Sequence, residues 1–140
     1  MTEYLFLYGT LLPKFAPAEL RRTMKRLRWT GEAQVRGRLY DLGEFPGAIL
    51  DASSESQIRG EVFSFSDDSV LEILDSYEEF DPENTEQSLF IRTKVAATLP
   101  VGRILDCWVY VYNRNPQNAS ILPDGDYSQF AAIRHPHPHS

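Results

Sequence analysis

Hydrophobic and polar positions alternate along much of the chain, and this pattern predicts a series of short strands. The first segment, residues 4–8, is mostly apolar and short enough to be a buried strand. Most of the later segments place apolar side chains at every second position, which is typical of half-buried strands. In all, we expect strands at residues 4–8, 33–39, 48–50, 58–65, 89–97 and 105–112. Gly60, inside the fourth strand, indicates a bulge or a close backbone approach.

Two other segments repeat their apolar residues at helical spacing. In the first, Leu20, Met24 and Leu27 follow Pro17, which suits the first turn of a helix. The second begins with three residues whose side chains suit a helix N-cap, at positions 66–68, and we expect this helix to continue to about Tyr77.

Strands outnumber helices, and helices separate only some of them. This order predicts an α+β domain around a mixed or antiparallel sheet that can curl into a barrel. The 140 residues fit one domain, which we place at residues 1–113. The segment 114–140 is rich in proline and polar residues, and we expect a partly ordered C-terminal extension there.

The charge and composition exclude several classes of function. A net charge of −6 argues against binding to nucleic acid, and the basic residues within 21–28 are best interpreted as the solvated face of a helix. No apolar run reaches the length of a membrane helix, and the N-terminus does not resemble a signal peptide. The only cysteine, Cys107, excludes an internal disulfide; we interpret it as a buried thiol and expect a cytoplasmic protein. His135, His137 and His139 alternate with prolines at the end of the chain, which we interpret as a disordered tail and not as a functional metal site; adventitious metal binding is the alternative.

Candidate chemistry first appears at the end of the second helix, where the sequence reads L-D-S-Y-E-E-F over residues 74–80. The apolar positions of this helix share one face, which we expect to point to the core: Val70, Ile73, Leu74 and Tyr77. Glu78 is the next position on this face. Glu79 falls instead on the polar side of the helix, where we also place Glu72 and Asp75.

An inward Glu78 has chemical consequences, because burial of a carboxylate raises its pKa towards neutrality, where a general acid/base works best. Two alternatives remain open at this stage. The helix can end at Tyr77 and leave both glutamates in solvent, or Glu78 can form an ion pair with Arg92 or Arg38.

The second candidate is Y-G-T-L, residues 8–11, directly after the first predicted strand. A glycine at a strand end lets the backbone turn and expose consecutive N–H groups, which can bind an anion. The alternative is an ordinary turn without a ligand.

Taken together and in order, several motifs resemble the gamma-glutamylcyclotransferase-like family, and in particular its gamma-glutamylamine cyclotransferase-like branch. The resemblance covers residues 4–112 and rests on these motifs: Y-G-T-L at 8–11, G-R-L-Y-D-L-G at 37–43, F-P-G-A at 45–48, L-D-S-Y-E at 74–78, F-I-R at 90–92 and W-V-Y-V-Y at 108–112. The resemblance implies a small mixed, mostly antiparallel β-barrel flanked by a few helices. It also implies an enzyme that converts a gamma-glutamyl amide into 5-oxoproline and a free amine.

The resemblance further implies a role for individual residues. Glu78 would be the catalytic acid/base, and the implied substrate-binding residues are Tyr8, Gly9, Thr10, Leu11, Gly47 and Tyr110. Tyr112 shares a strand face with Tyr110, and both can wall a pocket or simply pack. This chain departs from the family at Glu79, because the family often has glycine after the catalytic glutamate.

The implied reaction needs a small-molecule substrate with a gamma-glutamyl group, and neither a metal nor an organic cofactor. The substrate's own amine is already tethered to the carbonyl that it attacks, so one carboxylate can serve as base and then as acid. The alternative function is a non-catalytic module that binds a small molecule or a protein on the same fold.

Overall fold

The computed structural model describes residues 2–9, 11–12, 14–43, 45–116, 119–122 and 124–127. The strands are β1 (Glu3–Leu7), β2 (Arg28–Asp41), β3 (Pro46–Leu50), β4 (Gln57–Phe65), β5 (Phe90–Thr98), β6 (Ile104–Tyr112) and β7 (Ser120–Ile121). The α-helices are α1 (Arg21–Met24) and α2 (Ser69–Tyr77), and single 3₁₀ turns lie at Ala18–Leu20, Thr85–Gln87 and Pro100–Gly102. All six predicted strands are present, and β2 is longer than expected.

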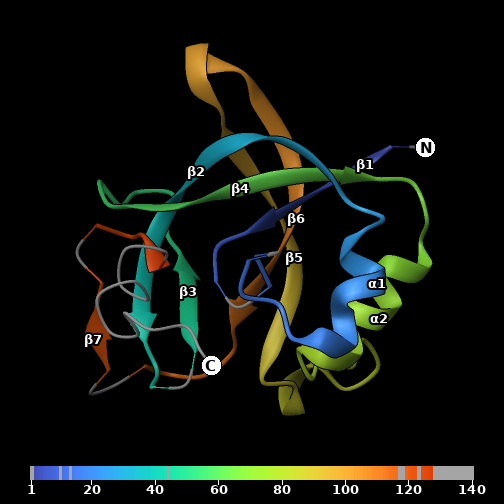
Figure 1. The fold of residues 1–140 in the computed structure, drawn as a ribbon. Coiled ribbons are helices and arrows are strands. Elements are labelled where there is room, and N and C mark those ends of the chain that lie inside the picture. Colours follow the sequence, from blue (N-terminus) through green and yellow to red (C-terminus); the bar gives the residue numbers. More distant parts are fainter. Residues whose placement is uncertain are drawn as a thin grey trace.

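The strands form one sheet in the order β3-β2-β4-β1-β6-β5, which closes into a barrel where β5 returns to β2 at the pair Gln34 and Thr98. β1 and β6 run parallel, and the other pairs are antiparallel. The predicted α+β fold with a mixed, mostly antiparallel barrel is therefore confirmed. Figure 1 shows α1 and α2 together on one side of the barrel, while the β5–β6 hairpin extends away from it.

β3 and β7 pair with the second half of β2, beyond the part that joins the barrel. β7 belongs to the predicted C-terminal extension, and the next residue, Leu122, is buried against the barrel. The boundary proposed at residue 113 stays a prediction. The histidines of the tail lie outside the described residues.

β1 is apolar at consecutive positions because its two faces pack against two different hydrophobic layers. Phe6 and Tyr8 point into the barrel interior, whereas Leu5 and Leu7 point to a layer between the sheet and the helices. The same alternation divides β6, where Cys107 is fully buried in the interior, as predicted. The close approach expected at Gly60 is confirmed, since a Cβ there would lie 2.4 Å from the carbonyl oxygen of Leu7.

The helical segments bury their apolar residues in the hydrophobic layer between the sheet and the helices. Leu20, Met24 and Leu27 are buried as expected, and the basic side chains between them are exposed. The N-cap residue of α2 is Asp68, within the predicted residues, but the side chain that accepts a backbone N–H is that of its neighbour Asp67, which bonds Ser69 at 2.9 Å. None of the described helices is long and apolar enough to cross a membrane.

Two details of the predicted α2 face are wrong. Ile73 is 37% exposed, and Asp75, expected on the polar side, is only 8% exposed. Val70 and Leu74 are buried as predicted, and the inward face is rotated only so far that Leu71 and Asp75 join them, with Glu78 following at the helix end. This rotation is possible because strands β5 and β6 supply polar partners to Asp75, from Arg92 and Tyr110.

Candidate active site

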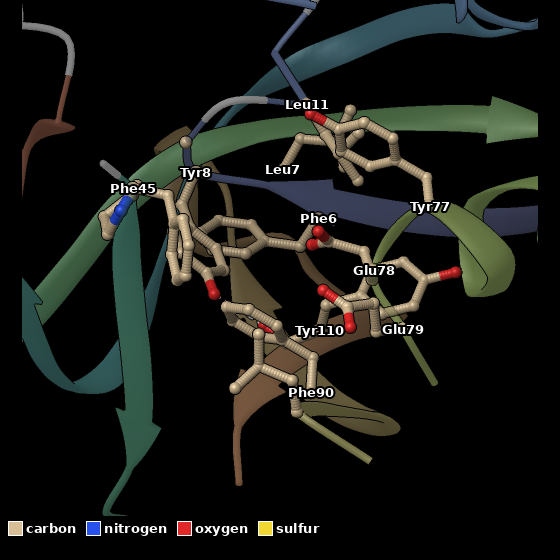
Figure 2. Close-up of a pocket in the computed structure, with 13 residues that line it drawn as sticks. Phe6, Leu7, Tyr8, Leu11, Phe45, Tyr77, Glu78, Glu79, Phe90 and Tyr110 are labelled. Carbon is tan, nitrogen blue, oxygen red and sulfur yellow. Dashed lines mark hydrogen bonds between the residues drawn. The ribbon is translucent and has the colours of Figure 1, made fainter. Parts of the chain in front are cut away.

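A cavity of about 240 Å³ opens between the end of α2, the end of β1 and strands β5 and β6. Figure 2 shows the Glu78 and Glu79 side chains reaching from the end of α2 into the space that Tyr8 and Phe45 border on the other side. The residues that line it are Phe6, Leu7, Tyr8, Gly9, Leu11, Phe45, Pro46, Tyr77, Glu78, Glu79, Leu89, Phe90 and Tyr110. An apolar pocket with a few polar groups is the usual form of a small-molecule site.

Most of the residues singled out in the sequence meet at this cavity. Tyr8, Gly9 and Leu11 line one part of it, and Glu78 and Tyr110 line another. Gly47 does not line the cavity: a Cβ there would lie 2.6 Å from a methyl group of Leu42 and 3.0 Å from Cβ of Tyr112. Its position therefore reflects the close packing of β3. Thr10 lies outside the described residues.

Glu78 is held at the cavity by the way in which α2 ends. The last helical residue is Tyr77, but the Glu78 N–H still donates to the Leu74 carbonyl at 2.9 Å. The next two N–H groups turn back, from Glu79 to the Ser76 carbonyl and from Phe80 to the Asp75 carbonyl. These two bonds define a Schellman motif.

The residue after the helix cap in such a motif adopts a left-handed conformation, which glycine accepts best. Here that residue is Glu79, at φ 58°. This geometry gives a physical reason for the glycine that the resemblance implies at this position. It also turns the Glu79 side chain, which is exposed, to the edge of the cavity beside Glu78.

Glu78 is largely buried, and this burial is the main reason why its pKa rises from 4.5 to about 7. The negative charge of Glu79 raises it further. Neither of the two alternatives from the sequence describes Glu78. The helix does end at Tyr77, yet Glu78 keeps the inward phase. Arg92 pairs with Asp75 and Arg38 pairs with Asp51 instead.

Tyr8 and Tyr110 form a connected wall of the cavity. The Tyr8 hydroxyl donates to the Tyr110 carbonyl at 2.6 Å and accepts the Ala48 N–H at 3.3 Å. The Tyr110 hydroxyl donates to the Asp75 carboxylate at 2.7 Å. Burial raises the pKa of both phenols above the ordinary value, so both stay neutral. Their hydroxyl protons are engaged within the protein.

The turn after β1 lies close to strand β3. A Cβ on Gly9 would be 2.5 Å from Cγ of Pro46, so only glycine lets these two segments approach this closely. The Gly9 carbonyl accepts the Leu12 N–H at 2.9 Å, which closes the turn. The two motifs Y-G-T-L and F-P-G-A therefore meet at this edge of the cavity.

Sequence reasoning did not single out several of the apolar walls. Phe45 and Phe90 lie with their ring centroids 5.7 Å apart and, with Phe6 and Leu89, make the cavity mostly hydrophobic. Phe6 could have been expected there from the alternation of β1, which directs it to the same face as Tyr8. Among the described residues, no three His, Cys, Asp or Glu side chains cluster as metal ligands.

Comparisons with known proteins agree with this fold. The profile of the family described as "Gamma-glutamyl cyclotransferase, AIG2-like" matches residues 5–129. The chain belongs to this family. No curated protein matches the sequence significantly.

Solved structures with the same fold include two from bacteria and one from mouse. YkqA of Bacillus subtilis is 22% identical, with a TM-score of 0.71 over 99% of this chain, which spans only 44% of YkqA. YtfP of Escherichia coli is 26% identical, with a TM-score of 0.61 over 89% of this chain and 95% of YtfP. An AIG2-like protein from Mus musculus is 20% identical, with a TM-score of 0.63 over 83% of this chain and 81% of its own.

Proposed function

We propose that this protein is a cyclotransferase that converts a gamma-glutamyl amide into 5-oxoproline and a free amine, with Glu78 as its acid/base. The observation that carries the proposal is a largely buried carboxylate, free of any ion pair among the described residues, in a cavity whose other wall includes the Tyr8–Gly9 turn. Membership of the family supports the reaction class.

One carboxylate is enough for both proton transfers of this reaction. The substrate's neutral α-amine attacks its own γ-carbonyl carbon, a C–N bond closes the five-membered ring, and the original amide C–N bond breaks. Glu78 accepts the proton from the attacking nitrogen and returns it to the departing nitrogen, so no other proton donor is needed. A pKa of about 7 suits both steps near neutral pH, because neither protonation state is strongly disfavoured.

Substrate folding is the second requirement. The tethered amine reacts fast only when it is held near the carbonyl, and the small apolar cavity favours such a compact conformation over an extended one. Backbone N–H groups at the turn after β1 are the proposed donors to the substrate carboxylate or to the oxyanion that develops on the carbonyl. Tyr8, Gly9, Thr10, Leu11 and Tyr110 are thus the proposed binding residues. Gly47 supports β3 beside them.

The test is a panel of gamma-glutamyl compounds assayed for 5-oxoproline, with gamma-glutamyl amino acids and gamma-glutamyl amines both present. For a compound that reacts, Glu78→Gln should lower kcat/KM by at least ~10², because the amide keeps the shape and cannot carry a proton. Glu79→Gln is the matched control and should keep most of the activity. Full activity in Glu78→Gln would contradict the assignment of the acid/base.

The rival function, a non-catalytic binding module, predicts a different outcome of the same panel. No compound would yield 5-oxoproline, although some would bind and raise the melting temperature of both the parent protein and Glu78→Gln. Release of 5-oxoproline that is lost in Glu78→Gln excludes this rival.

A further inference from the structure

A largely buried polar network lies beside the cavity and reaches its wall at Tyr110. Asp75 and Arg92 form a two-bond ion pair, with Nε to Oδ1 at 2.7 Å and an Nη to Oδ2 at 3.0 Å. Their side chains are 11% and 16% exposed, so the pair is largely shielded from water. Neither residue lines the cavity, and the proposed reaction assigns no role to either.

Arg92 contacts the chain on both sides of the turn that carries Glu78. Its guanidinium holds Asp75 three residues before Glu78, and it lies 5.8 Å from the ring of Phe80, two residues after it. Asp75 and Phe80 are themselves joined, because the Phe80 N–H donates to the Asp75 carbonyl at 2.9 Å. Glu78 and Glu79 therefore lie in a loop whose two ends meet at one guanidinium.

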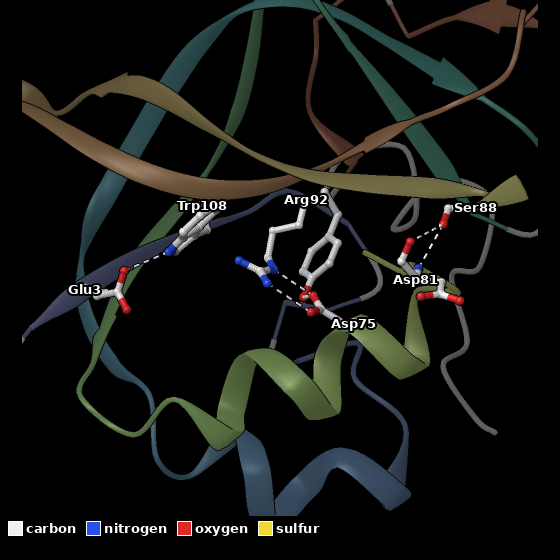
Figure 3. Close-up of polar contacts among 7 residues, drawn as sticks. Glu3, Asp75, Asp81, Ser88, Arg92 and Trp108 are labelled. Atoms are coloured by element: carbon white, nitrogen blue, oxygen red, sulfur yellow. Dashed lines mark hydrogen bonds and ion pairs between the residues drawn. The ribbon is translucent and has the colours of Figure 1, made fainter. Parts of the chain in front are cut away.

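The other side of Arg92 is fixed to the barrel. Figure 3 shows the guanidinium between the Asp75 carboxylate and the indole of Trp108, whose ring centroid is 4.4 Å away. The Trp108 N–H donates to the Glu3 carboxylate at 2.9 Å, which ties β6 to β1. The network thus runs from strands β1, β5 and β6 to the last turn of α2.

The same carboxylate also fixes a wall of the cavity. Asp75 accepts the Tyr110 hydroxyl, and the Tyr110 carbonyl accepts the Tyr8 hydroxyl. One buried group therefore connects the turn that carries Glu78 with the two tyrosines of the cavity wall. A displacement of Asp75 would move both sides of the site.

We propose that the Asp75–Arg92 pair is a positioning clamp, which holds the last turn of α2 against β5 and β6 so that the Glu78 carboxylate stays in the cavity. This inference rests on the proposed function for its effect on turnover. Its effect on the position of Glu78 does not depend on any activity. Asp75 and Arg92 are positioning residues in this scheme, because neither touches the substrate.

The test uses a double variant, Asp75→Asn with Arg92→Met. Removing both charges leaves no unpaired buried ion, which would otherwise endanger folding, and Asn can still accept the Tyr110 hydroxyl. A second variant, Arg92→Lys, keeps the charge and loses the planar two-bond geometry. The control is Arg26→Gln, which breaks the exposed pair with Asp67 at the opposite end of α2.

The first readout is the titration of Glu78, followed by NMR of the ¹³C-labelled side-chain carboxyl and assigned with Glu78→Gln. If the clamp holds Glu78 in the cavity, the double variant should let it reach water, and its pKa should fall from about 7 towards 4.5. Arg92→Lys should give an intermediate value, and Arg26→Gln should leave the titration unchanged. An unchanged Glu78 pKa in a folded double variant would overturn the proposal.

The second readout is kinetic, on any substrate that the panel identifies. The double variant should lose about 10- to 100-fold in kcat with a much smaller change in KM, since the acid/base is displaced while most binding contacts remain. A loss confined to KM would also count against a positioning role. If the parent protein releases no 5-oxoproline, the proposed function fails, and the NMR titration still decides whether the clamp exists.

Discussion

Two carboxylates on the inward face of α2, Asp75 and Glu78, lie one helical turn apart in opposite surroundings. Asp75 receives two hydrogen bonds from Arg92 and one from Tyr110, whereas Glu78 faces an apolar cavity and the negative charge of Glu79. Asp75 therefore has a counter-charge, whereas Glu78 has no ion pair among the described residues. A carboxyl group with a strongly raised pKa in a cavity is a candidate for a functional site. The comparison separates a fully paired carboxylate from the one that we propose as the acid/base.

Removal of Arg92, the charged partner of Asp75, should have the largest effect on stability. Arg92→Ala should lower the free energy of unfolding by about 3–5 kcal/mol, because it leaves a carboxylate in a poorly solvated site without its counter-charge. Urea denaturation at pH 7 would measure the loss. Arg38→Ala, at the partly exposed pair with Asp51, is the control and should cost less than about 1 kcal/mol. Equal losses would mean that burial does not distinguish the two pairs.

Mutation of Glu78 should have the opposite effect on stability and raise the free energy of unfolding. The pKa of Glu78 is higher in the folded protein than in the unfolded chain, so the folded state binds the proton more tightly between pH 4.5 and about 7. Ionised Glu78 therefore destabilises the fold above pH 7. Glu78→Gln should raise the free energy of unfolding by on the order of 2 kcal/mol at pH 8, and much less at pH 5. A gain that is the same at both pH values would contradict this linkage.

The backbone conformation of Glu79, next to Glu78, should also affect stability. Glu79→Gly should stabilise the protein by about 1 kcal/mol, because glycine adopts the left-handed conformation at φ 58° without the steric cost of a Cβ. Thermal unfolding would show the gain. Glu79→Ala removes the same carboxylate but keeps the Cβ, so it should lack most of this stabilisation.

The smallest expected effect concerns the charge of Glu79. Glu79→Gln removes the second cause of the raised Glu78 pKa, so the acid limb of the kcat/KM profile should shift to lower pH, by roughly half a pH unit. The shift should shrink in 1 M salt, which screens an exposed charge. Desolvation would remain as the larger cause, so the limb should stay above pH 4.5.

Short-range sequence patterns predicted those features of the fold that depend on neighbouring residues in the chain. The strand positions followed from alternation, and helical phase indicated an inward Glu78 but left a solvated or ion-paired Glu78 open as alternatives. The same phase placed Asp75 in solvent, because its partners Arg92 and Tyr110 are 17 and 35 residues away along the chain. Burial of a polar residue is decided by such distant partners, which a helical period cannot reveal.

The candidate site shows the same limit. Tyr8 and Gly9 could be singled out as a strand end and a turn, but their approach to Pro46 depends on how β3 packs. The hydrophobic cavity walls at Phe45 and Phe90 come from separate elements that no short window of sequence contains. The lack of a cavity-lining position for Gly47 is likewise a matter of strand packing.

The parallel pairing of β1 with β6 has a consequence for how the protein folds. Tyr8 and Tyr110 are 102 positions apart and share a hydrogen bond. β1 can therefore pair with β6, its second neighbouring strand, only after almost the whole domain has been synthesised. Pairings of such long range carry a high loop-closure cost and slow the folding of a chain. During synthesis on the ribosome, one edge of β1 remains without its strand partner until β6 has emerged, and the cavity cannot exist before then.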